Sequence, residues 1–388
     1  MKKPLIKFVR HKQSGVRSAV DYYSPDYFAA KTRFVAACDR LGLKRHSLPI
    51  EAPSPNNEPL TIDVAVAGDP RPTSALVVSS GVHGVEGFFG SAVQLAFLES
   101  LSPRWQPPPG AAFIFIHALN PFGFAWQRRF NEDNVDLNRN FLLADEEYAG
   151  APPLCGVFRR ALMKHPSRPR MVPVASRIAL LALRHGVRSF WETLPVGQYE
   201  FPDWLFFGGR GRSQTAQLLD RLLPVLLERC EEMVHLDFHT GLGRWADCKL
   251  LLSERDSSDG AAWWKTQFGG ENVVEADGAR TTYQIRGGFG SWLLARFPQS
   301  RYRFATAEFG TYSPLRVIRA LADELHWHAK LSTQYADHWV RRRLTETFVP
   351  RDPRWRTKTL DAGLSLVRRA ADALWSSAAA PDALRVAS

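Results

Sequence analysis

The chain has 388 residues, of which 45% are hydrophobic, and this is enough apolar material for a large core that needs no disulfides. Its four cysteines have neither the density nor the paired spacing of a disulfide scaffold or a zinc finger, which predicts a reducing compartment. There is no apolar stretch of about 18 residues, and the N-terminus lacks the apolar run of a secretory signal, so we expect a cytoplasmic protein without a membrane span. The net charge of +11 leaves room for an anionic substrate or partner.

The first 120 residues alternate between helical and strand-like patterns. A helix is predicted over residues 24–42, where Ser24 can cap the start, Pro25 suits the first helical position and Gly42 ends the pattern. A polar loop at 51–59 separates this helix from strand-like segments. The next elements are strands at 61–66 and 75–80, a helix after Gly90 and a strand at 111–120. This order indicates an α/β fold with a largely parallel sheet.

Residues 145–232 are less regular and are predicted to form a helical insertion or cap. Within them, 154–191 holds eight Lys or Arg residues and no acid, which favours a solvated basic face. No signature of a nucleic-acid-binding module accompanies this charge, so we expect no nucleic-acid partner. The glycine-rich piece at 208–212 does not follow a strand in the nucleotide-binding pattern, which argues against phosphate binding.

Strand patterns return after this region, and the chain ends in amphipathic helical patterns. The strands are predicted at 233–239 and 302–309, and the helices at 314–347 and 359–376. No internal repeat or low-complexity segment is present. We therefore predict one domain over residues 1–388, with 145–232 as an insertion or cap and 314–388 as a helical C-terminal extension.

Two histidine-containing motifs lie where predicted strands meet loops, and sites form at this edge in open α/β sheets. In GVHGVEG, residues 81–87, His83 and Glu86 are three residues apart among glycines, which let the loop turn both side chains towards one point. In HLDFHTG, residues 235–241, His239 ends the strand and Asp237 lies on the same face. Histidine and glutamate are zinc ligands. Taken singly, each motif is also compatible with a structural histidine, and Asp237 with either a ligand-orienting or a structural role.

Two further motifs carry charged or polar residues that would be unfavourable in a hydrophobic core. The segment 120–141 contains NPFG, RRFN and VDLNRNF, and its arginines suit a carboxylate, which a guanidinium binds bidentately. In AEFGT, residues 307–311, Glu308 ends an apolar strand, where a carboxylate is costly unless it is paired or functional. A salt-bridged surface loop and a structural ion pair are the respective alternatives. The loop YQIRGG before this strand carries Tyr283.

Taken in chain order, 81–87, 120–141, 235–241 and 307–311, the four motifs resemble the zinc carboxypeptidase family of metallopeptidases, and within it the bacterial DUF2817 branch. The motifs span residues 81–311, and the V-D-L-N-R-N-F segment is the most specific of them. The resemblance implies an α/β fold with a mixed eight-stranded sheet flanked by helices, and the residue patterns add the helical insertion and the C-terminal helices.

The resemblance also implies a role for individual residues. It implies one zinc ion per chain, held by His83, Glu86 and His239, with Glu308 as the catalytic base. Arg129 would polarise the scissile carbonyl, although its neighbour Arg128 could instead be the matching arginine. Asn138 and Arg139 would bind the substrate carboxylate. Tyr283 would close over the substrate, and Asp136 would support a zinc-bound histidine.

The implied activity is hydrolysis of an amide bond next to a free carboxylate, with Glu308 assisting the attack of a zinc-bound water. The expected substrate is a small peptide or an acylated amino acid. Two alternatives stay open: an N-acyl amino acid deacylase of the aspartoacylase or desuccinylase type on the same scaffold, and a catalytically dead module that binds anionic ligands. No residue of the specificity pocket can be carried over from the family, so the substrate side chain is left open.

Overall fold

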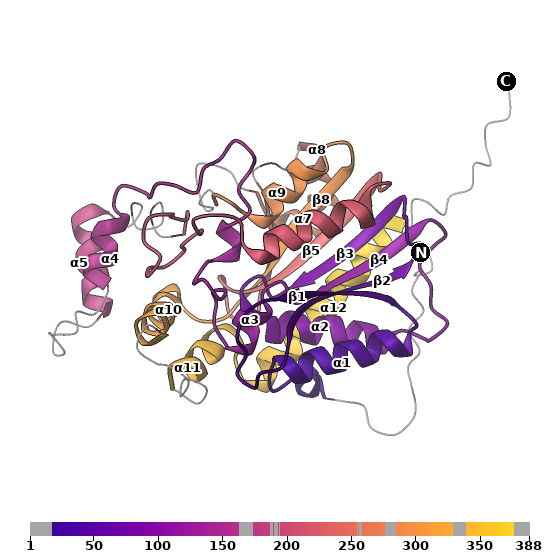
Figure 1. Cartoon of the computed structure of the whole chain (residues 1–388), viewed down its shortest axis with the longest axis horizontal. Helices are drawn as coiled ribbons and strands as arrows, with labels where there is room; N and C mark the ends of the chain where they lie inside the picture. The colour runs from indigo at the N-terminus through magenta and orange to yellow at the C-terminus, as the bar shows by residue number, and fades with distance from the viewer. Residues whose placement is uncertain are drawn as a thin grey trace.

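The computed structural model describes residues 18–162, 174–186, 189, 193, 195–253, 255, 258–275, 285–328 and 339–375. At its centre is an eight-stranded mixed sheet in the order β1-β2-β4-β3-β5-β8-β6-β7 (Figure 1). The strands are β1 (Lys44–Ile50), β2 (Leu60–Gly68), β3 (Ser74–Ser80), β4 (Ala111–His117), β5 (Glu232–Gly241), β6 (Cys248–Leu252), β7 (Val273–Val274) and β8 (Arg301–Gly310). The α/β fold with a mixed eight-stranded sheet is therefore confirmed.

The four central strands, β4, β3, β5 and β8, are parallel, whereas β1–β2, β2–β4 and β6–β8 pair antiparallel and the short β7 runs parallel to β6. Central parallel strands are covered on both faces and therefore consist of nearly continuous apolar residues. This is why β4 is buried at every position and why the predicted strands 61–66, 75–80, 111–120, 233–239 and 302–309 match β2, β3, β4, β5 and β8 closely. The sheet is less parallel than the sequence predicted, because β2 on one side and β6 with β7 on the other run opposite to the central strands.

Helices cover both faces of this sheet (Figure 1). One face packs against α1 (Tyr27–Arg40), α2 (Gly87–Ser100) and α12 (Pro353–Trp375), and the other against α7 (Gln214–Leu227) and α9 (Phe289–Arg296). The other helices among the described residues are α3 (Pro121–Ala125), α4 (Cys155–Leu162), α5 (Val174–His185), α8 (Ser258–Phe268), α10 (Pro314–His328) and α11 (Trp339–Phe348). Single 3-10 turns span Ala19–Tyr22, Gly84–Glu86, Leu137–Arg139 and Gly270–Asn272.

The first helix begins later than the sequence predicted. The cap of α1 is Asp26, whose side chain accepts a hydrogen bond from the Ala29 amide at 2.8 Å. Ser24 instead accepts a hydrogen bond from Arg33, so Ser24 and Pro25 lie outside the helix. At the other end of the chain, α10 and α11 cover the two ends of the predicted helix 314–347, and residues 329–338 between them lie outside the described residues.

The region 145–232 contains α4, α5 and α7. Helix α7 covers the sheet, whereas α4 and α5 lie at one end of the molecule, away from the strands (Figure 1). Part of the basic stretch 154–191 lies outside the described residues. The division into one domain with an insertion and a C-terminal extension stays a prediction.

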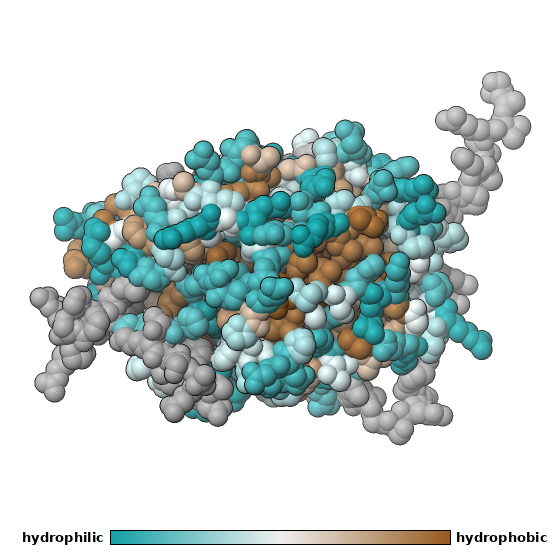
Figure 2. Space-filling model, in the orientation of Figure 1, coloured by the Kyte–Doolittle hydropathy of each residue, from teal (hydrophilic) through white to brown (hydrophobic). Residues whose placement is uncertain are grey.

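Hydrophilic side chains spread over most of the face seen in Figure 2, and hydrophobic residues show mainly between them. Among the described residues, no helix combines the length and the apolarity that crossing a bilayer requires.

The alternation of side chains along β5 separates the core from the polar side of the sheet. Phe238 points towards α2, where its ring lies 5.9 Å from that of Phe89. His235 points to the opposite face, 5.7 Å from the ring of Phe289 in α9. Because neighbours along a strand face opposite ways, Asp237 and His239 share the face of His235. The parallel strands β3, β5 and β8 also end at the same edge, so the residues that follow them meet there.

Candidate active site

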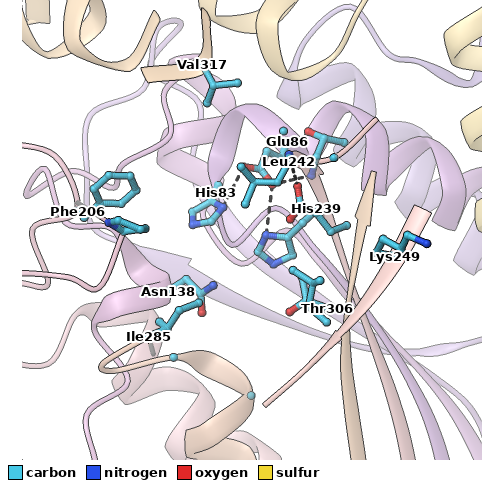
Figure 3. A pocket seen from close by; sticks show the side chains of 18 of the residues that line it. His83, Glu86, Asn138, Phe206, His239, Leu242, Lys249, Ile285, Thr306 and Val317 are labelled. Carbon is cyan, nitrogen blue, oxygen red and sulfur yellow. Dashed lines mark hydrogen bonds and ion pairs between the residues drawn. The ribbon is translucent and has the colours of Figure 1, made fainter. Parts of the chain in front are cut away.

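Three buried side chains meet at the carboxyl ends of β3 and β5. His83 and Glu86 come from the turn after β3, and His239 comes from the end of β5. His83 Nδ1 lies 2.9 Å from one carboxylate oxygen of Glu86, and His239 Nδ1 lies 3.3 Å from the other. Each residue offers a ligand atom within 4.8 Å of the others (Figure 3). The structure therefore brings the three predicted zinc ligands to one point.

Glycine lets the turn that carries His83 approach its neighbour so closely. A Cβ atom on Gly84 would lie 2.0 Å from the backbone carbon of Gly123, so the two backbones touch. The same turn is held by hydrogen bonds from the Gly84 amide to the Arg129 carbonyl (3.2 Å) and from the Val85 amide to the Arg128 carbonyl (2.7 Å). The first and third sequence motifs therefore form one unit of structure, although about 40 residues separate them.

A buried aspartate stands behind each histidine. His83 Nε2 lies 3.1 Å from Asp136, and His239 Nε2 lies 2.6 Å from Asp237. The second oxygen of Asp237 accepts a hydrogen bond from Ser79 at 2.6 Å. An aspartate that accepts a hydrogen bond from Nε2–H favours the tautomer in which Nδ1 carries a free lone pair facing inwards, which is the tautomer a metal needs.

The donor set fits a zinc ion, because two imidazole nitrogens and one carboxylate are a common zinc ligand set. His83 Nδ1 is buried and makes no hydrogen bond of acceptable geometry, although the Glu86 carboxylate is near it. His83 Nε2 also lies 2.7 Å from Arg129 Nη2. A metal on Nδ1 would leave the proton on Nε2, which would then donate to Asp136 rather than accept from Arg129.

Charge holds this cluster in its ionised form. Burial by itself raises the pKa of Glu86, but His83 and His239 bring that pKa well below its ordinary range. Burial likewise raises the pKa of Asp136, and Arg129 with His83 lowers it well below the ordinary value. For His239, burial lowers the pKa, but Asp237 and then Glu86 raise it well above the usual value. The carboxylates are therefore charged and ready to accept a cation.

The two neighbouring arginines have different surroundings. Arg129 lines the pocket and contacts Glu86 (3.2 Å) and Asp136 (3.0 Å). Arg128 is completely buried and pairs with Glu324 of α10 at 2.6 Å. Of the two, therefore, Arg129 is the arginine that a substrate in the pocket could reach.

Glu308 lies beside the histidine cluster because of the register of the sheet. Strand pairing places Glu308 directly opposite His239, at the strand spacing of roughly 4.8 Å. Its Oε1 accepts a hydrogen bond from the Leu242 amide at 2.8 Å. On its other side, Lys249 is the cross-strand neighbour, but its ammonium donates to the Glu271 carbonyl instead. Burial, and then the charge of Glu86, raise the pKa of Glu308 to about 7.

The predicted carboxylate clamp borders the same pocket, which has a volume of about 350 Å³. Asn138 Oδ1 accepts a hydrogen bond from the Phe289 amide at 2.9 Å. The nitrogen of the Asn138 side chain therefore points away from Phe289 (Figure 3). The guanidinium of Arg139 is buried and donates to the carbonyls of Pro195 and Asn138. Tyr283 lies outside the described residues.

The walls of the pocket are largely apolar and were not predicted from the sequence. They include Leu242, Leu251, Val274, Ile285, Phe304, Val317, Ile318, Leu321 and Phe348. These residues come from several strands, helices and loops. An apolar residue on such an element looks like any core residue until the tertiary structure shows that it borders a cavity. Asp237 was noted in the sequence, but only its contact with His239 separates an orienting role from a structural one.

A family model described as "Protein of unknown function (DUF2817)" matches residues 23–362. The chain belongs to this family. The DUF2817 match includes every candidate residue from His83 to Glu308. No curated protein matches the chain.

Solved structures resemble this DUF2817 protein only distantly. A proposed metallopeptidase from Shewanella baltica OS155 has 14% identity and a TM-score of 0.43, covering 88% of this chain and 92% of its own. Carboxypeptidase A from Helicoverpa armigera has 13% identity and a TM-score of 0.42, covering 92% and 74%. The murein-tripeptide amidase MpaA from Escherichia coli O157 has 21% identity and a TM-score of 0.37, covering 74% and 92%. Similarity this low carries no argument about activity.

The raised pKa of Glu308 predicts a pH-dependent term in the stability of the metal-free DUF2817 protein. Its pKa of about 7 in the folded chain exceeds the ordinary 4.5, so the stability that Glu308 contributes is complete below about pH 4.5 and is lost as the pH rises through about 7. Glu308→Gln should therefore raise the free energy of unfolding at about pH 8, by roughly 1–3 kcal/mol, and leave it nearly unchanged at about pH 4. Urea unfolding with a chelator present measures both values.

Glu228→Gln provides the control, because Glu228 is an exposed glutamate at the end of α7. A pH-dependent effect of the same size in Glu228→Gln would show that the effect is not specific to the buried Glu308. An equal effect of Glu308→Gln at both pH values would contradict the raised pKa.

Proposed function

We propose that this chain is a zinc-dependent hydrolase that cleaves an amide bond next to a free carboxylate. The observation that supports it best is the meeting of two histidines, one glutamate and a second, protonatable glutamate in one pocket. Three protein ligands with an open side are typical of catalytic rather than structural zinc sites. The unpaired state of all four cysteines agrees with action in the cytoplasm.

His83, Glu86 and His239 would hold one zinc ion per chain. Bound there, zinc would supply a Lewis acid that lowers the pKa of water towards about 7. Asp136 and Asp237 would fix the orientation of the two imidazoles through their Nε2 protons.

Glu308 would act as the general base and then as the general acid. A carboxyl group with a pKa of about 7 takes up and releases a proton near neutral pH with little cost, which suits both steps. The register with His239 keeps it next to the zinc ligands, so it can take the proton of the attacking water. It would later give that proton to the leaving amine.

The two pocket arginines would bind different parts of the substrate. Arg129, beside the cluster, would donate hydrogen bonds to the oxyanion that develops on the scissile carbonyl, which is usually the largest catalytic contribution. Asn138 and Arg139 would bind the free carboxylate and hold the amide in position for attack. For Tyr283 we propose closure over the substrate, on sequence resemblance alone.

The substrate would be a small peptide or an acylated amino acid. Val317, Ile318 and Leu321 present an apolar side of α10 to the pocket. An apolar wall offers no partner for the peptide groups of a long chain, and this favours the deacylase alternative, in which an acyl group occupies that wall. Assays on a panel of dipeptides and N-acyl amino acids distinguish peptide cleavage from deacylation. Bound zinc without turnover of any amide would instead favour a catalytically dead binding module.

We predict one zinc ion per chain, lost on removal of one ligand. His239→Ala should reduce zinc content strongly while the fold is retained, because the remaining two ligands bind far more weakly. Zinc should raise the thermal unfolding temperature of the parent chain, since a ligand at about 100 times its Kd stabilises the folded state by about 2.7 kcal/mol. Elemental analysis and thermal unfolding measure this, and full zinc occupancy in His239→Ala would overturn the ligand assignment.

Glu308→Gln should retain zinc but lose turnover by at least about 10²-fold, the low end for general acid–base catalysis. Glutamine keeps the size of the side chain but cannot take a proton. The measurement is kcat on the best amide of the panel. A near-normal kcat would assign the base to another group.

The clamp predicts a requirement for the substrate carboxylate. Converting that carboxylate to an amide should cost roughly 2–5 kcal/mol, because a desolvated arginine loses its ionic partner. We expect kcat/KM to fall by about 30-fold or more. Arg139→Lys should impair cleavage of the acid far more than of the amide, because lysine cannot form two parallel hydrogen bonds. Equal cleavage of acid and amide by the parent chain would indicate an endo-acting amidase.

A further inference from the structure

Residues 195–208, a segment of the region 145–232, hold Arg139, together with the Asn138 carbonyl that accepts a hydrogen bond from Arg139 Nη1. The Pro195 carbonyl accepts hydrogen bonds from Arg139 Nε at 2.9 Å and Nη2 at 2.5 Å. The Tyr199 hydroxyl donates to the Arg139 carbonyl at 2.8 Å. Side chain and backbone of the arginine are thus both bound by the same short stretch.

Two glycines allow this segment to approach Arg139. Gly197 has φ +109°, and a Cβ atom there would lie 2.8 Å from Arg139 Cδ. A Cβ atom on Gly208 would lie 2.7 Å from the Arg139 carbonyl oxygen. Any larger residue at either position would displace the arginine or the segment.

Phe206 completes the enclosure from the pocket side. Its ring centre lies 5.5 Å from the guanidinium carbon of Arg139 and also 5.5 Å from that of Arg129. Guanidinium groups are attracted to an aromatic face at such distances. Phe206 lines the pocket near His83 (Figure 3), and it has φ 57°, a backbone conformation that is costly for a residue other than glycine. Strain of this kind is typical of functional sites.

We propose that Pro195, Gly197, Tyr199, Phe206 and Gly208 form an arginine cradle that positions Arg139 for the substrate carboxylate. By holding the guanidinium in place before substrate binds, the cradle removes the entropy loss that a free arginine side chain would suffer on binding. The shared contact with Phe206 also fixes the position of Arg139 relative to Arg129. The cradle therefore sets the distance between the carboxylate and the scissile amide.

This proposal rests on the proposed function in that it deepens the role given to Arg139. It assigns the residues of the cradle as positioning residues, since the polar contacts to substrate are made by Arg139. A purely structural cradle would merely stabilise the fold, and its loss would affect acid and amide ligands equally. A positioning cradle affects the preference for the acid.

The test uses the zinc-loaded full chain with Glu308→Gln, so that binding is measured without turnover. Calorimetry compares N-acetyl-leucine with N-acetyl-leucine amide. Phe206→Leu, which keeps an unbranched Cβ at the same φ, should lower the ratio of acid to amide affinity by about 10-fold or more, because the guanidinium is no longer held. Tyr199→Phe should lower it less, since it removes a single hydrogen bond. Phe206→Tyr keeps the ring and should restore the ratio.

Phe201→Leu is the matched control. Phe201 lies in the same segment, but its ring faces Arg159 rather than Arg139. The same substitution there should leave the ratio unchanged. An unchanged ratio in Phe206→Leu, or a parent chain without preference for the acid, overturns the cradle.

The chain without the Glu308 substitution, assayed on the same pair of compounds and on the panel of amides, tests the proposed function separately. If it hydrolyses no amide while the affinity ratio responds to Phe206→Leu and not to Phe201→Leu, the cradle stands and the hydrolase proposal fails. If amides are hydrolysed while the ratio is insensitive to Phe206→Leu, the hydrolase proposal stands and the cradle fails.

Discussion

The Glu86 carboxylate, placed between the Nδ1 atoms of His83 and His239, is the interaction on which the site depends. A buried carboxylate is costly unless positive charge and hydrogen bonds surround it. Here one oxygen faces His83 and Arg129, and the other faces His239 and accepts the Thr240 amide at 3.0 Å. The surrounding structure thus supplies partners on every side of Glu86, and a cation bound between the same three residues would serve the same need.

The parallel sheet brings these partners together. Strands that run in the same direction end at the same edge, so residues from distant parts of the chain meet without long loops. The period of two along each strand then assigns neighbours to opposite faces, with Phe238 in the core and His239 at the site. The pairing of β5 with β8 places Glu308 directly opposite His239, so the spacing of adjacent strands sets the distance between the proposed base and a proposed zinc ligand.

Arg128 and Arg129 are neighbours in sequence, but they have different roles because they bind different partners. Arg128 forms an ion pair with Glu324 of α10, whereas Arg129 forms one with Glu86 in the histidine cluster. Because α10 also lines the pocket, the buried pair Arg128–Glu324 links the wall of the pocket to the segment that carries Arg129. Arg139 is bound by residues 195–208, so a segment from outside the family motifs completes the polar part of the site.

By itself the sequence predicted the central strands, because their residues are buried on both faces and are continuously apolar. It also singled out His83, Glu86, His239 and Glu308, because they sit next to strand ends and glycines, and the family resemblance gave them the proposed roles of ligands and base. It missed β1, β6 and β7, which are short or half-exposed and so lack a clear pattern. Only the tertiary structure shows that Arg129 rather than Arg128 lines the pocket, that Asp237 contacts His239, and that residues 195–208 bind Arg139. Each depends on contacts between residues far apart in the chain, and no local pattern carries that information.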